Sequence, residues 1–511
     1  MNVAHVHDTR TEDVGEYRGV TYIWPDGREE IYPSDLLREK SMRLAGAFRN
    51  LGLAPGDRVA LTMPNSPLVG VSYQGVLRSG LVIVPMLFLL SAKEINHILV
   101  DSEASAFITS AEFTEKAQEA VAGTQAKLIV AEGAPPPGAL SFDELCTAEP
   151  AEDIVEREDS DLAMLIYTGG TTGRSKGVMI THGNMWAGAR SLRKLAEQDG
   201  REAYVGLGVL PLSHAYGVLM SLDSALSSRG SILLRWFSPE LFLSALEKHR
   251  ATATALVPAM MAMLLACPDA GKRDTSSLKL VSVGSAPCPA DLIRAFEEKF
   301  GCTVAEGYGL SESIAALSTN LFSRRKLGTV GPPLPGVEVA IFDDEDNPLP
   351  VGQVGEVVCR GPQVMAGYWK APEETAAVLR DGWLHTADLG HLDEDGYITI
   401  VDRKRDLIIR GGFNVFPTEV EEVLLEHPAV AEAAVVGVSD PVYGEEVVAV
   451  VAAKPGADLD KDALIAFARS KLASYKAPRA VVVVDALPRS SIMKILRREA
   501  REIARHALED S

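Results

Sequence analysis

The sequence is poor in cysteine and has no long apolar run. Its 511 residues include five cysteines, and no two of them are spaced C-x-x-C. This argues against a zinc site and fits reduced thiols in the cytosol. The longest apolar stretch, residues 81–90, is too short to span a bilayer and contains Pro85. The first eight residues lack the basic and apolar pattern of a secretory signal. We therefore expect a cytoplasmic protein without stable membrane insertion.

Positive charge is also in short supply. The formal net charge is −20 at pH 7, so the overall field of the protein repels nucleic-acid backbones and anionic lipid surfaces. This charge disfavours a nucleic-acid partner. A small anionic ligand would have to be met by local positive groups.

The pattern of the remaining sequence is that of an α/β protein. Hydrophobic residues make up 47% of the chain, and its length predicts two to four domains. A helix capped by Ser34 is predicted through about Leu51 and another over residues 67–79, with strands over 57–63 and 81–86. Further along, Thr181 or Asn184 is predicted to cap a helix that carries Trp186, Leu192 and Leu195. Alternating strands and helices predict layered α/β subdomains with mainly parallel sheets.

The rhythm changes after a hairpin turn at residues 393–396. A helix over 419–425, strands over 433–438 and 447–452, a helix over 460–472 and a strand over 481–484 predict a small α+β domain. We place the domain boundary between residues 402 and 403, which gives an N-terminal domain of 1–402 and a C-terminal domain of 403–511.

A glycine-rich stretch, Tyr167–Gly177, lies between two apolar runs. It holds four glycines, three threonines and Lys176. Glycines let backbone N–H groups face a ligand, and hydroxyls and an ammonium add donors and charge. These features predict a polyphosphate-binding loop, although it does not match the Walker A pattern. A plain surface turn is the alternative.

Three further turns follow strand-like runs, at Val209–Gly217, Leu280–Pro287 and Cys302–Glu312. Ligands of open α/β sheets collect beyond the carboxyl ends of the strands, so these turns are consistent with one cleft. Tyr308 could stack on a flat base, Ser311 could donate to phosphate, and Glu312 could hold Mg²⁺. An acid that complements a helix dipole is the alternative for Glu312. The position of His214 allows either a structural or a functional role.

These motifs together resemble those of the adenylate-forming (ANL) superfamily, which includes acyl-CoA synthetases. The resemblance covers nearly the whole chain. It rests on Tyr167–Gly177, Pro211–Gly217, Gly307–Glu312, Trp383–Asp388, Asp402–Asp406, Gly411–Glu419 and Pro488–Lys494.

The resemblance implies an ATP site. It assigns the phosphates to Thr168, Gly169, Gly170, Thr171, Thr172, Gly173 and Lys176. It assigns the adenosine to Gly284, Ser285, Ala286, Glu306, Gly307, Tyr308, Gly309, Ser311, Asp388, Ile400 and Arg403, with Asp388 and Arg403 at the ribose. Glu312 would ligate Mg²⁺, and Gly411, Gly412 and Phe413 would line a tunnel for coenzyme A. The catalytic set is Lys494, His214, Glu312 and Lys176.

The resemblance also implies a two-step reaction and a mobile C-terminal domain. Lys494 would assist attack of a carboxylate on the α-phosphate. The C-terminal domain would then rotate about a hinge near Arg405, so that the thiol of CoA can attack the acyl-adenylate. The chain departs from the family pattern in three places: Ser311 replaces Thr, Ala387 replaces Gly, and Met493 replaces the Gly before Lys494. The change at Ala387 is expected to cost little.

The acid is expected to be a fatty or aryl carboxylic acid. The resemblance assigns its pocket to Trp186, His214, Tyr216, Gly217, Val257, Gly284, Leu310 and Ser313. Two alternatives stay open at this point: an adenylating ligase with a non-CoA acceptor, and a non-catalytic nucleotide-binding protein. A homodimer is one oligomeric state that the sequence allows.

Overall fold

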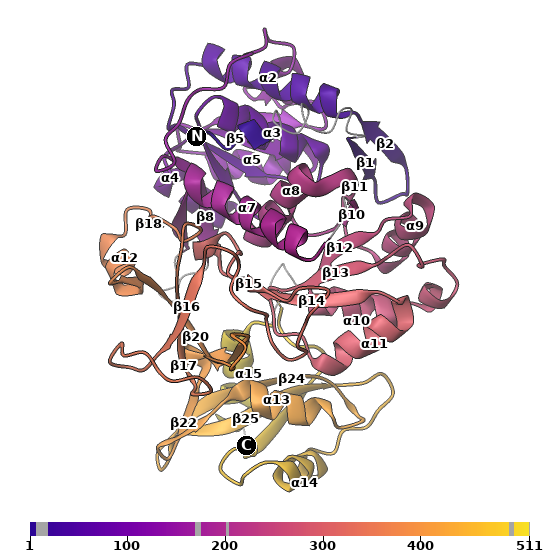
Figure 1. Ribbon diagram of the computed structural model, residues 1–511, viewed down its shortest axis with the longest axis vertical. Helices are drawn as coiled ribbons and strands as arrows, with labels where there is room; N and C mark the ends of the chain where they lie inside the picture. Colours follow the sequence, from indigo (N-terminus) through magenta and orange to yellow (C-terminus); the bar gives the residue numbers. More distant parts are fainter. Residues whose placement is uncertain (7–18, 169–174, 201–203, 490–494, 510–511) are drawn as a thin grey trace. The chain divides into compact units, whose positions relative to one another are not determined.

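The computed structural model of the chain describes residues 1–6, 19–168, 175–200, 204–489 and 495–509 (Figure 1). The chain forms two compact units. Unit 1 comprises Met1–Val339 and Cys359–Leu384, and unit 2 comprises Ala340–Val358 and His385–Ser511. The two units divide the chain at other residues than the predicted boundary between 402 and 403. That boundary stays a prediction for the C-terminal domain that would rotate. Each unit is described by itself.

The first sheet of unit 1 has the order β18-β9-β8-β4-β3-β5-β6-β7. Its strands are β3 (Arg58–Thr62), β4 (Val82–Pro85), β5 (Ala104–Ser110), β6 (Lys127–Ala131), β7 (Leu140–Ser141), β8 (Leu162–Thr168), β9 (Lys176–Thr181) and β18 (Gly367–Tyr368). Neighbours from β8 to β7 are parallel, whereas β9 is antiparallel to both β8 and β18. The predicted mainly parallel sheet is confirmed.

Alternating side chains explain why helices cover both faces of this sheet. Val59 and Leu61 point to one face of β3 and Ala60 to the other. The first face packs against α2 (Ser34–Asn50), α3 (Pro67–Arg78), α7 (His182–Gln198) and α8 (Ala215–Ser227). The second packs against α4 (Ala92–Asp101) and α5 (Thr114–Val121). The short helix α6 (Phe142–Leu145) follows β7.

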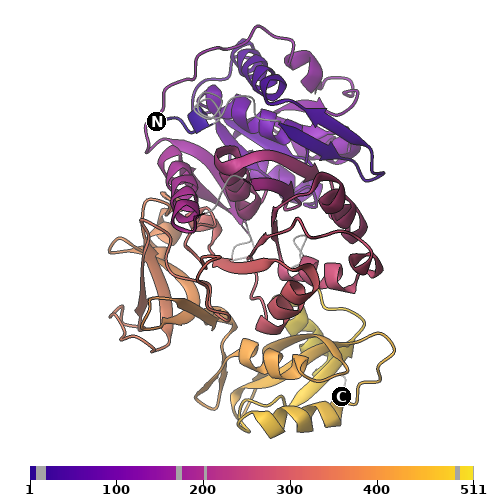
Figure 2. The same ribbon diagram turned by 45° about the vertical axis from the view of Figure 1, so that its right-hand side comes forward.

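The second sheet of unit 1 has the order β15-β14-β13-β12-β10-β11-β1-β2. Its strands are β1 (Val20–Ile23), β2 (Glu29–Tyr32), β10 (Tyr204–Gly208), β11 (Ser228–Leu234), β12 (Ala253–Leu256), β13 (Leu280–Val283), β14 (Thr303–Tyr308) and β15 (Ser318–Thr319). One face packs against α9 (Pro239–His249), α10 (Pro258–Ala266) and α11 (Ala290–Phe300). Figure 2 shows these helices and strands after a turn of the molecule.

Two local predictions need correction. Ser34 is the first residue of α2 and not its cap, because the N-cap position is taken by Pro33 without a side-chain bond. The expected strand-like run at Val209 is a loop, because β10 ends at Gly208 and α8 begins at Ala215. His214 therefore lies just ahead of a helix. The predicted cap at Thr181 is confirmed: it forms a capping box with Asn184.

Unit 2 contains a sheet with the order β23-β22-β25-β24, to which β26 adds beside β25. The strands are β22 (Ile408–Arg410), β23 (Phe413–Val415), β24 (Val430–Asp440), β25 (Gly444–Ala453) and β26 (Ala480–Val484). Helices α13 (Pro417–Leu425) and α14 (Lys461–Lys471) pack on one face, and α15 (Arg497–Glu509) packs on the other. The α+β prediction is thereby confirmed.

The chain crosses between the two units within three strands, β16 (Glu338–Phe342), β17 (Gly355–Arg360) and β20 (Trp383–Leu392). Strand β19 (Leu379–Arg380) and helix α12 (Pro372–Val378) belong to unit 1, and β21 (Ile398–Arg403) belongs to unit 2. The predicted turn at 393–396 joins β20 to β21, and the N–H of Gly396 donates to the carbonyl of Asp393. Within the described part of the chain, no helix combines the length and apolar character needed to cross a membrane.

Candidate functional site

The glycine-rich stretch joins two antiparallel strands. Thr168 ends β8 and is paired with Lys176, which begins β9. The predicted phosphate-loop residues Gly169, Gly170, Thr171, Thr172 and Gly173 lie outside the described residues. The two apolar runs that predicted the flanking strands are confirmed, and they fix the two ends of the loop next to each other.

Lys176 lies against two side chains from the second segment of unit 1. Its Nζ is 3.6 Å from Oε1 of Glu374 and 5.7 Å from the centre of the Tyr368 ring. The ring distance is within the range of a cation–π contact. The Lys176 side chain is 19% exposed and that of Glu374 is 46% exposed, so a ligand could still reach the ammonium group.

The same tyrosine reaches Glu312. Its hydroxyl donates to Oε1 of Glu312 at 2.8 Å, and burial, followed by the charge of Glu312, raises the pKa of Tyr368. The structure thus brings Lys176 and Glu312 together through a residue that the sequence analysis did not single out. Tyr368 and Glu374 lie in a short polar and aromatic stretch without periodicity. The sequence therefore contains no clear signal for either residue.

Glu312 fits a Mg²⁺ ligand. A carboxylate oxygen is the donor that Mg²⁺ prefers, and nucleotide-bound Mg²⁺ is held by one or two carboxylates plus phosphate oxygens. No group of three or more His, Cys, Asp or Glu side chains forms a cation site within the described residues. A single carboxylate that shares the cation with a nucleotide is consistent with both observations.

The carboxyl ends of three parallel strands meet at one edge of the second sheet. Leu256 of β12, Val283 of β13 and Glu306 of β14 occupy corresponding positions, and the N–H of Gly284 donates to the carbonyl of Leu256 at 3.4 Å. Predicted site residues follow these positions directly. Val257 follows Leu256, residues 284–286 follow Val283, and the residues from Gly307 onward follow Glu306. The two predicted turns after β13 and β14 therefore lie at one edge of this sheet.

The turn after β14 is closely packed. A Cβ at Gly309 would lie 2.3 Å from the carbonyl carbon of Ala315, which no larger residue could tolerate. The N–H of Leu310 donates to Oγ of Ser313 at 3.1 Å, and Ser311 begins a short 3-10 helix. This packing fixes Tyr308 at the end of β14 and Glu312 in the following helix. Ser285, after β13, has a φ of 69°.

His214 and Tyr216 flank the start of α8. The backbone N–H of Tyr216 donates to Nδ1 of His214 at 3.3 Å, and the Tyr216 hydroxyl is 2.8 Å from Oγ of Ser282. A Cβ at Gly284 would lie 3.8 Å from the Tyr216 ring. Tyr216 and Gly284 are therefore neighbours. A Cβ at Gly217 would lie 2.0 Å from the carbonyl oxygen of Pro211, so this turn of α8 requires glycine.

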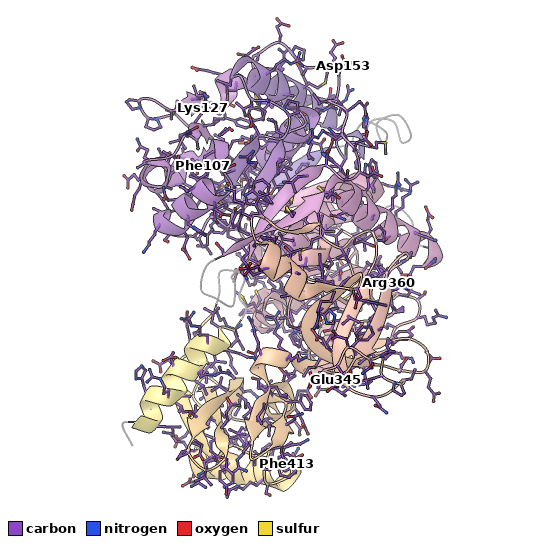
Figure 3. All side chains as sticks on the ribbon, turned by 90° about the vertical axis from the view of Figure 1, so that its left-hand side faces the viewer. Phe107, Lys127, Asp153, Glu345, Arg360 and Phe413 are labelled. Atoms are coloured by element: carbon purple, nitrogen blue, oxygen red, sulfur yellow. The ribbon has the colours of Figure 1, made fainter. Side chains whose placement is uncertain are left out.

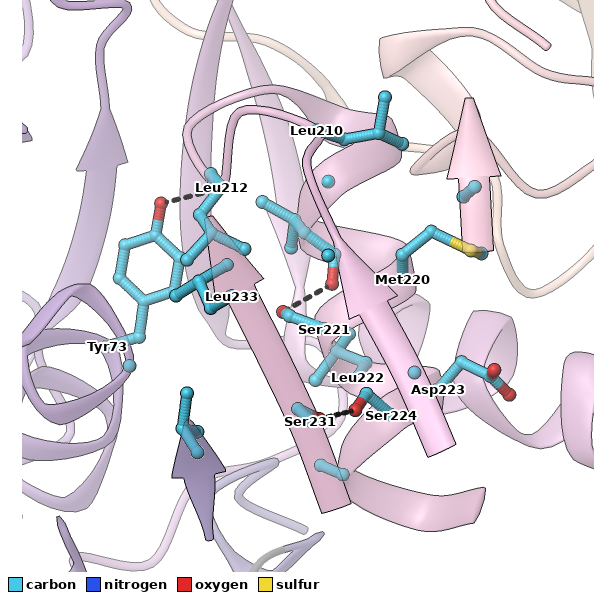
Figure 4. A pocket seen from close by; sticks show the side chains of 18 of the residues that line it. Tyr73, Leu210, Leu212, Met220, Ser221, Leu222, Asp223, Ser224, Ser231 and Leu233 are labelled. Carbon is cyan, nitrogen blue, oxygen red and sulfur yellow. Dashed lines mark hydrogen bonds between the residues drawn. The ribbon is translucent and has the colours of Figure 1, made fainter. Parts of the chain in front are cut away.

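A cavity of about 340 Å³ lies in unit 1 between the second sheet and helices α3 and α8 (Figure 4). This volume is within the range of roughly 300–1,000 Å³ that small-molecule sites have. Its floor contains residues of β15, β13, β12, β10, β11 and β1, and its walls contain Gly217, Ser221 and Ser224 of α8 and Gly70, Gln74 and Leu77 of α3. Spacings of three and four residues place each wall set on one helix face.

Most hydroxyl groups of the cavity wall are already hydrogen-bonded. Tyr73 donates to the carbonyl of Leu212 at 2.9 Å, and the hydroxyls of Ser224 and Ser231 are 2.6 Å apart (Figure 4). Tyr204 donates to Asp223 at 2.6 Å. Gln74 is an exception, since its buried Oε1 has no partner among the described residues and can accept from water or a ligand hydroxyl. The cavity therefore offers mainly carbon surface.

The predicted acid pocket and this cavity overlap only in part. Gly217 lines the cavity, and so does Ser282, the partner of Tyr216. Trp186, His214, Val257, Gly284, Leu310 and Ser313 are not among its lining residues. Trp186 is buried on α7, with the Arg190 guanidinium 4.8 Å from its ring centre. The sequence did not reveal the cavity, because it depends on which faces of α3 and β10 meet.

Glu306 is a buried carboxyl group beside the strand-end turns. Its side chain accepts a hydrogen bond from the backbone N–H of Cys288 at 3.1 Å. Burial raises the pKa of Glu306 to about 8, because the charged form loses its hydration without gaining a cation. The group is therefore largely protonated at neutral pH.

In unit 2, Asp388 and Arg403 occupy paired positions on β20 and β21. Nε of Arg403 is 3.3 Å from Oδ1 of Asp388, and the Asp388 side chain is 6% exposed. Ala387 has a φ of 58°, in the left-handed region that costs a residue with a Cβ about 1 kcal/mol or more. The substitution of Gly by Ala there thus carries a strain that the sequence analysis did not anticipate.

The other predicted residues of unit 2 lie on the same hairpin or after it in the sequence. Ile400 is paired with Gly390 on the same hairpin. Gly411 and Gly412 form the turn between β22 and β23, and the exposed Phe413 (Figure 3) packs its ring 4.9 Å from that of Tyr475. Arg405 is half exposed beside Asp406. Lys494 and Met493 lie outside the described residues.

Comparison with known families gives matches over most of the chain. The family of AMP-binding enzymes matches residues 35–369, and its C-terminal domain matches residues 419–494. A long-chain-fatty-acid–CoA ligase of Bacillus subtilis (strain 168) is 37% identical over 499 residues, covering 92% of this chain and 89% of the relative. A feruloyl-CoA synthase of Amycolatopsis sp is 38% identical over 476 residues, covering 91% and 92% respectively.

A solved structure extends the similarity to three dimensions. ATP-bound MatB from Rhodopseudomonas palustris superposes with a TM-score of 0.88 at 32% identity, covering 98% of this chain and 99% of that one. The fold of this chain is therefore that of a protein captured with ATP.

Proposed function

The chain belongs to the AMP-binding enzyme family, as an AMP-forming acyl-CoA synthetase that uses ATP, and we propose that its acid is a long straight-chain fatty acid. The cavity of unit 1, which is lined by strands from β15 to β1, carries this proposal. Its lining includes Ser282, whose Oγ is 2.8 Å from the Tyr216 hydroxyl, and Val20 of β1. An acid whose carboxyl group lies near Tyr216 could extend its chain along the sheet.

The length of the cavity favours a long chain over a compact ring. Between β13 and β1 the sheet order contains four strand-to-strand steps, and strands lie about 4.8 Å apart, which gives about 19 Å. A carbon–carbon bond measures about 1.5 Å, so this span accommodates at least about a dozen bonds. Gly206 and Gly208 line the cavity from β10 without side chains. A Cβ would lie 3.2 Å from the Tyr204 ring at Gly206 and 3.3 Å from the Leu233 side chain at Gly208.

The first half-reaction requires positive groups around the phosphates. An oxygen of the fatty carboxylate attacks the α-phosphorus of ATP, the bond to the β-phosphate oxygen breaks, and pyrophosphate leaves. We assign Lys176 to the β- and γ-phosphates and Lys494 to the α-phosphate, where negative charge grows in the transition state. Glu312 would hold Mg²⁺, which neutralises phosphate oxygens when bound. Asp388 and Arg403 would hydrogen-bond the ribose hydroxyls.

The second half-reaction transfers the acyl group to a thiol. The thiolate of coenzyme A attacks the carbonyl carbon of the acyl-adenylate, the bond to the phosphate oxygen breaks, and AMP leaves. We assign the thin pantetheine arm of CoA to Gly411 and Gly412, since a backbone without side chains permits a close approach. Phe413, which is exposed, would contact the same arm.

Pyrophosphate release across a panel of acids tests the proposal. Straight-chain acids from C4 to C18, benzoate and ferulate would be assayed with and without CoA. We expect activity to rise with chain length and thioester to form only with CoA. A maximum at the aryl acids would contradict the proposed substrate while leaving the acyl-CoA synthetase assignment intact.

A blocked cavity makes the test specific. Gly206→Val places two methyl groups at the middle of the cavity, so we expect long acids to lose activity while short acids keep theirs. Val205→Leu is the matched control, because Val205 is on the same strand, packs toward the opposite core and is not among the cavity-lining residues. Equal loss for short and long acids in Gly206→Val would count against the cavity as the chain site.

An aryl acid is the second candidate. The similarity to a feruloyl-CoA synthase favours it, and a ring could lie beside Tyr216 and Gly284 without entering the cavity. In that case, Gly206→Val would leave the activity unchanged for every acid that the wild-type enzyme accepts.

A further inference from the structure

One tyrosine contacts both charged groups that the proposed function assigns to the triphosphate end of ATP. The Tyr368 hydroxyl donates to Glu312 at 2.8 Å, and its ring centre is 5.7 Å from Nζ of Lys176. Lys176 and Glu312 come from segments about 136 residues apart, and Tyr368 comes from a third. The Glu312 carboxylate and the Lys176 ammonium group thus both contact the Tyr368 side chain.

Backbone bonds hold Tyr368 firmly in place. Strand β18 pairs with β9, with Tyr368 opposite Val178, and the N–H of Trp369 donates to the carbonyl of Gly177 at 2.7 Å. The N–H of Tyr368 donates to Oγ1 of Thr375 at 2.9 Å. The N–H of Met365 donates to the carbonyl of Glu312 at 2.8 Å. The strand therefore ties the end of the phosphate loop to the turn that carries Glu312.

We propose that Tyr368 is the positioning residue of this site: its hydroxyl orients the Glu312 carboxylate for a divalent cation, while its ring supports Lys176 for the phosphates. This inference rests on the proposed function, since it concerns the same nucleotide. The hydroxyl of Tyr368 would thus serve cation binding, and its ring would serve phosphate binding.

The chemistry of a phenol suits this task. A neutral donor orients a carboxylate without cancelling the negative charge that attracts the cation, whereas a lysine or arginine would cancel it. A tyrosine hydroxyl has an ordinary pKa of about 10, so it keeps its proton and remains a donor at neutral pH. The electron-rich ring face attracts the ammonium group without forming a competing salt bridge.

Glu374 also contacts Lys176, but through a negative charge instead of an aromatic ring. Its carboxylate is 3.6 Å from Nζ and competes with phosphate for the same ammonium group. The pair is partly exposed, and exposed pairs contribute little, so the triphosphate can displace it. Removing this charge acts on phosphate binding alone, whereas removing the Tyr368 hydroxyl acts on the cation alone.

Calorimetric titration with ATP separates these effects. The full-length protein is titrated once with excess Mg²⁺ and once with EDTA, without acid or CoA, and the ratio of the two dissociation constants measures the contribution of the cation. The variants are Tyr368→Phe, Tyr368→Leu and Glu374→Gln. The matched control is Tyr32→Phe, because Tyr32 donates to Glu30 at 2.7 Å in the same kind of bond on the β1–β2 hairpin.

We expect Tyr368→Phe to leave binding in EDTA unchanged and to reduce the gain from Mg²⁺ by roughly tenfold, as for a hydrogen bond to a charged group. Tyr368→Leu should weaken binding in both conditions, because the support for Lys176 is also lost. Glu374→Gln should tighten both by about two- to fivefold with an unchanged ratio. Tyr32→Phe should change neither constant.

Three results would overturn the inference. Two unchanged dissociation constants in Tyr368→Phe would show that the hydroxyl does not orient the metal ligand. Equal weakening in both conditions by Tyr368→Phe would indicate a merely structural role. Failure of the wild-type protein to bind ATP in either condition would remove the proposed function as well, which separates it from the first two results.

Discussion

The two units hold their predicted nucleotide-binding carboxylates in different ways. In unit 1, Glu312 accepts a hydrogen bond from the neutral Tyr368 hydroxyl. In unit 2, the buried Asp388 lies 3.3 Å from the cationic Nε of Arg403. Among the described residues no cation forms an ion pair with Glu312, whereas Arg403 compensates the charge of Asp388.

This difference matches the ligands that the two carboxylates are proposed to bind. A divalent cation is attracted by an uncompensated charge, whereas neutral ribose hydroxyls require only oriented acceptors. A compensated carboxylate can also be buried at lower cost than a lone one. The side chain that hydrogen-bonds or pairs with each carboxylate thus indicates whether the ligand of that carboxylate is charged or neutral.

The strongest test of this comparison removes the charge from unit 1. Glu312→Gln keeps the shape of the side chain and its bond to Tyr368 but loses the attraction for the cation. We expect the rate of fatty acid-dependent pyrophosphate release to fall by roughly 10²–10³-fold. Stopped-flow or coupled pyrophosphate assays measure this, and a fall of less than threefold would show that the charge of Glu312 is not used.

The corresponding change in unit 2 should act on affinity. Asp388→Asn leaves one acceptor oxygen and removes the partner of Arg403, so we expect nucleotide binding to weaken by roughly 10- to 100-fold. Calorimetry with ATP and 2′-deoxy-ATP is the measurement. The wild-type protein should prefer ATP, and the variant should discriminate less. Equal discrimination in both proteins would remove Asp388 from the ribose site.

A third carboxyl group, Glu306, extends the comparison because the hydrogen bond it accepts comes from the uncharged backbone N–H of Cys288. Burial raises its pKa to about 8, above the value of about 4.3 for an unfolded chain. Folding therefore favours the protonated form, and the stability it contributes is lost as the pH rises from about 4 toward 8.

Glu306→Gln should remove this loss. We expect the variant to be more stable than the wild type at pH 8.5 by about 1–2 kcal/mol and to differ less at pH 5. Thermal unfolding at both pH values tests the sign. A difference of equal size at both pH values would mean that the titration of Glu306 does not contribute.

The smallest effect concerns the backbone beside Asp388. Ala387 has a φ of 58°, so Ala387→Gly should relieve strain and stabilise the protein by about 0.5–1 kcal/mol, after allowing for the greater freedom of glycine in the unfolded chain. Calorimetric unfolding measures this. Destabilisation would indicate that the Ala387 methyl group makes contacts that outweigh the strain.

The sequence predicted the parts of this molecule that depend on local pattern. Continuous apolar runs located β3, β8 and β9, and the apolar residues after a capping position located α7. The strand-end turns around Gly284 and Tyr308 were predicted because parallel strands share one edge. The capping box at Thr181 is likewise a local signal.

The rest depends on contacts between distant segments. Tyr368 lies in a two-residue strand with no period of its own, and its partners Lys176 and Glu312 are far away in the chain. The cavity arises where glycines of β10 meet one face of α3, which the sequence of neither element shows. The left-handed backbone of Ala387 is set by the hairpin around it, so a substitution that looks harmless in the sequence carries strain.

The position of β18 has a consequence for biosynthesis. Strand β9, with Lys176 at its start, has β18 as its outer neighbour, yet β18 leaves the ribosome only after roughly 190 more residues, or about 10–40 s of translation at ~5–20 residues per second. During that interval β9 is an unpaired edge, the kind of strand that recruits foreign chains. The phosphate-binding side of the enzyme is thus finished late, and we expect nascent chains stalled before residue 367 to be the most sensitive to aggregation.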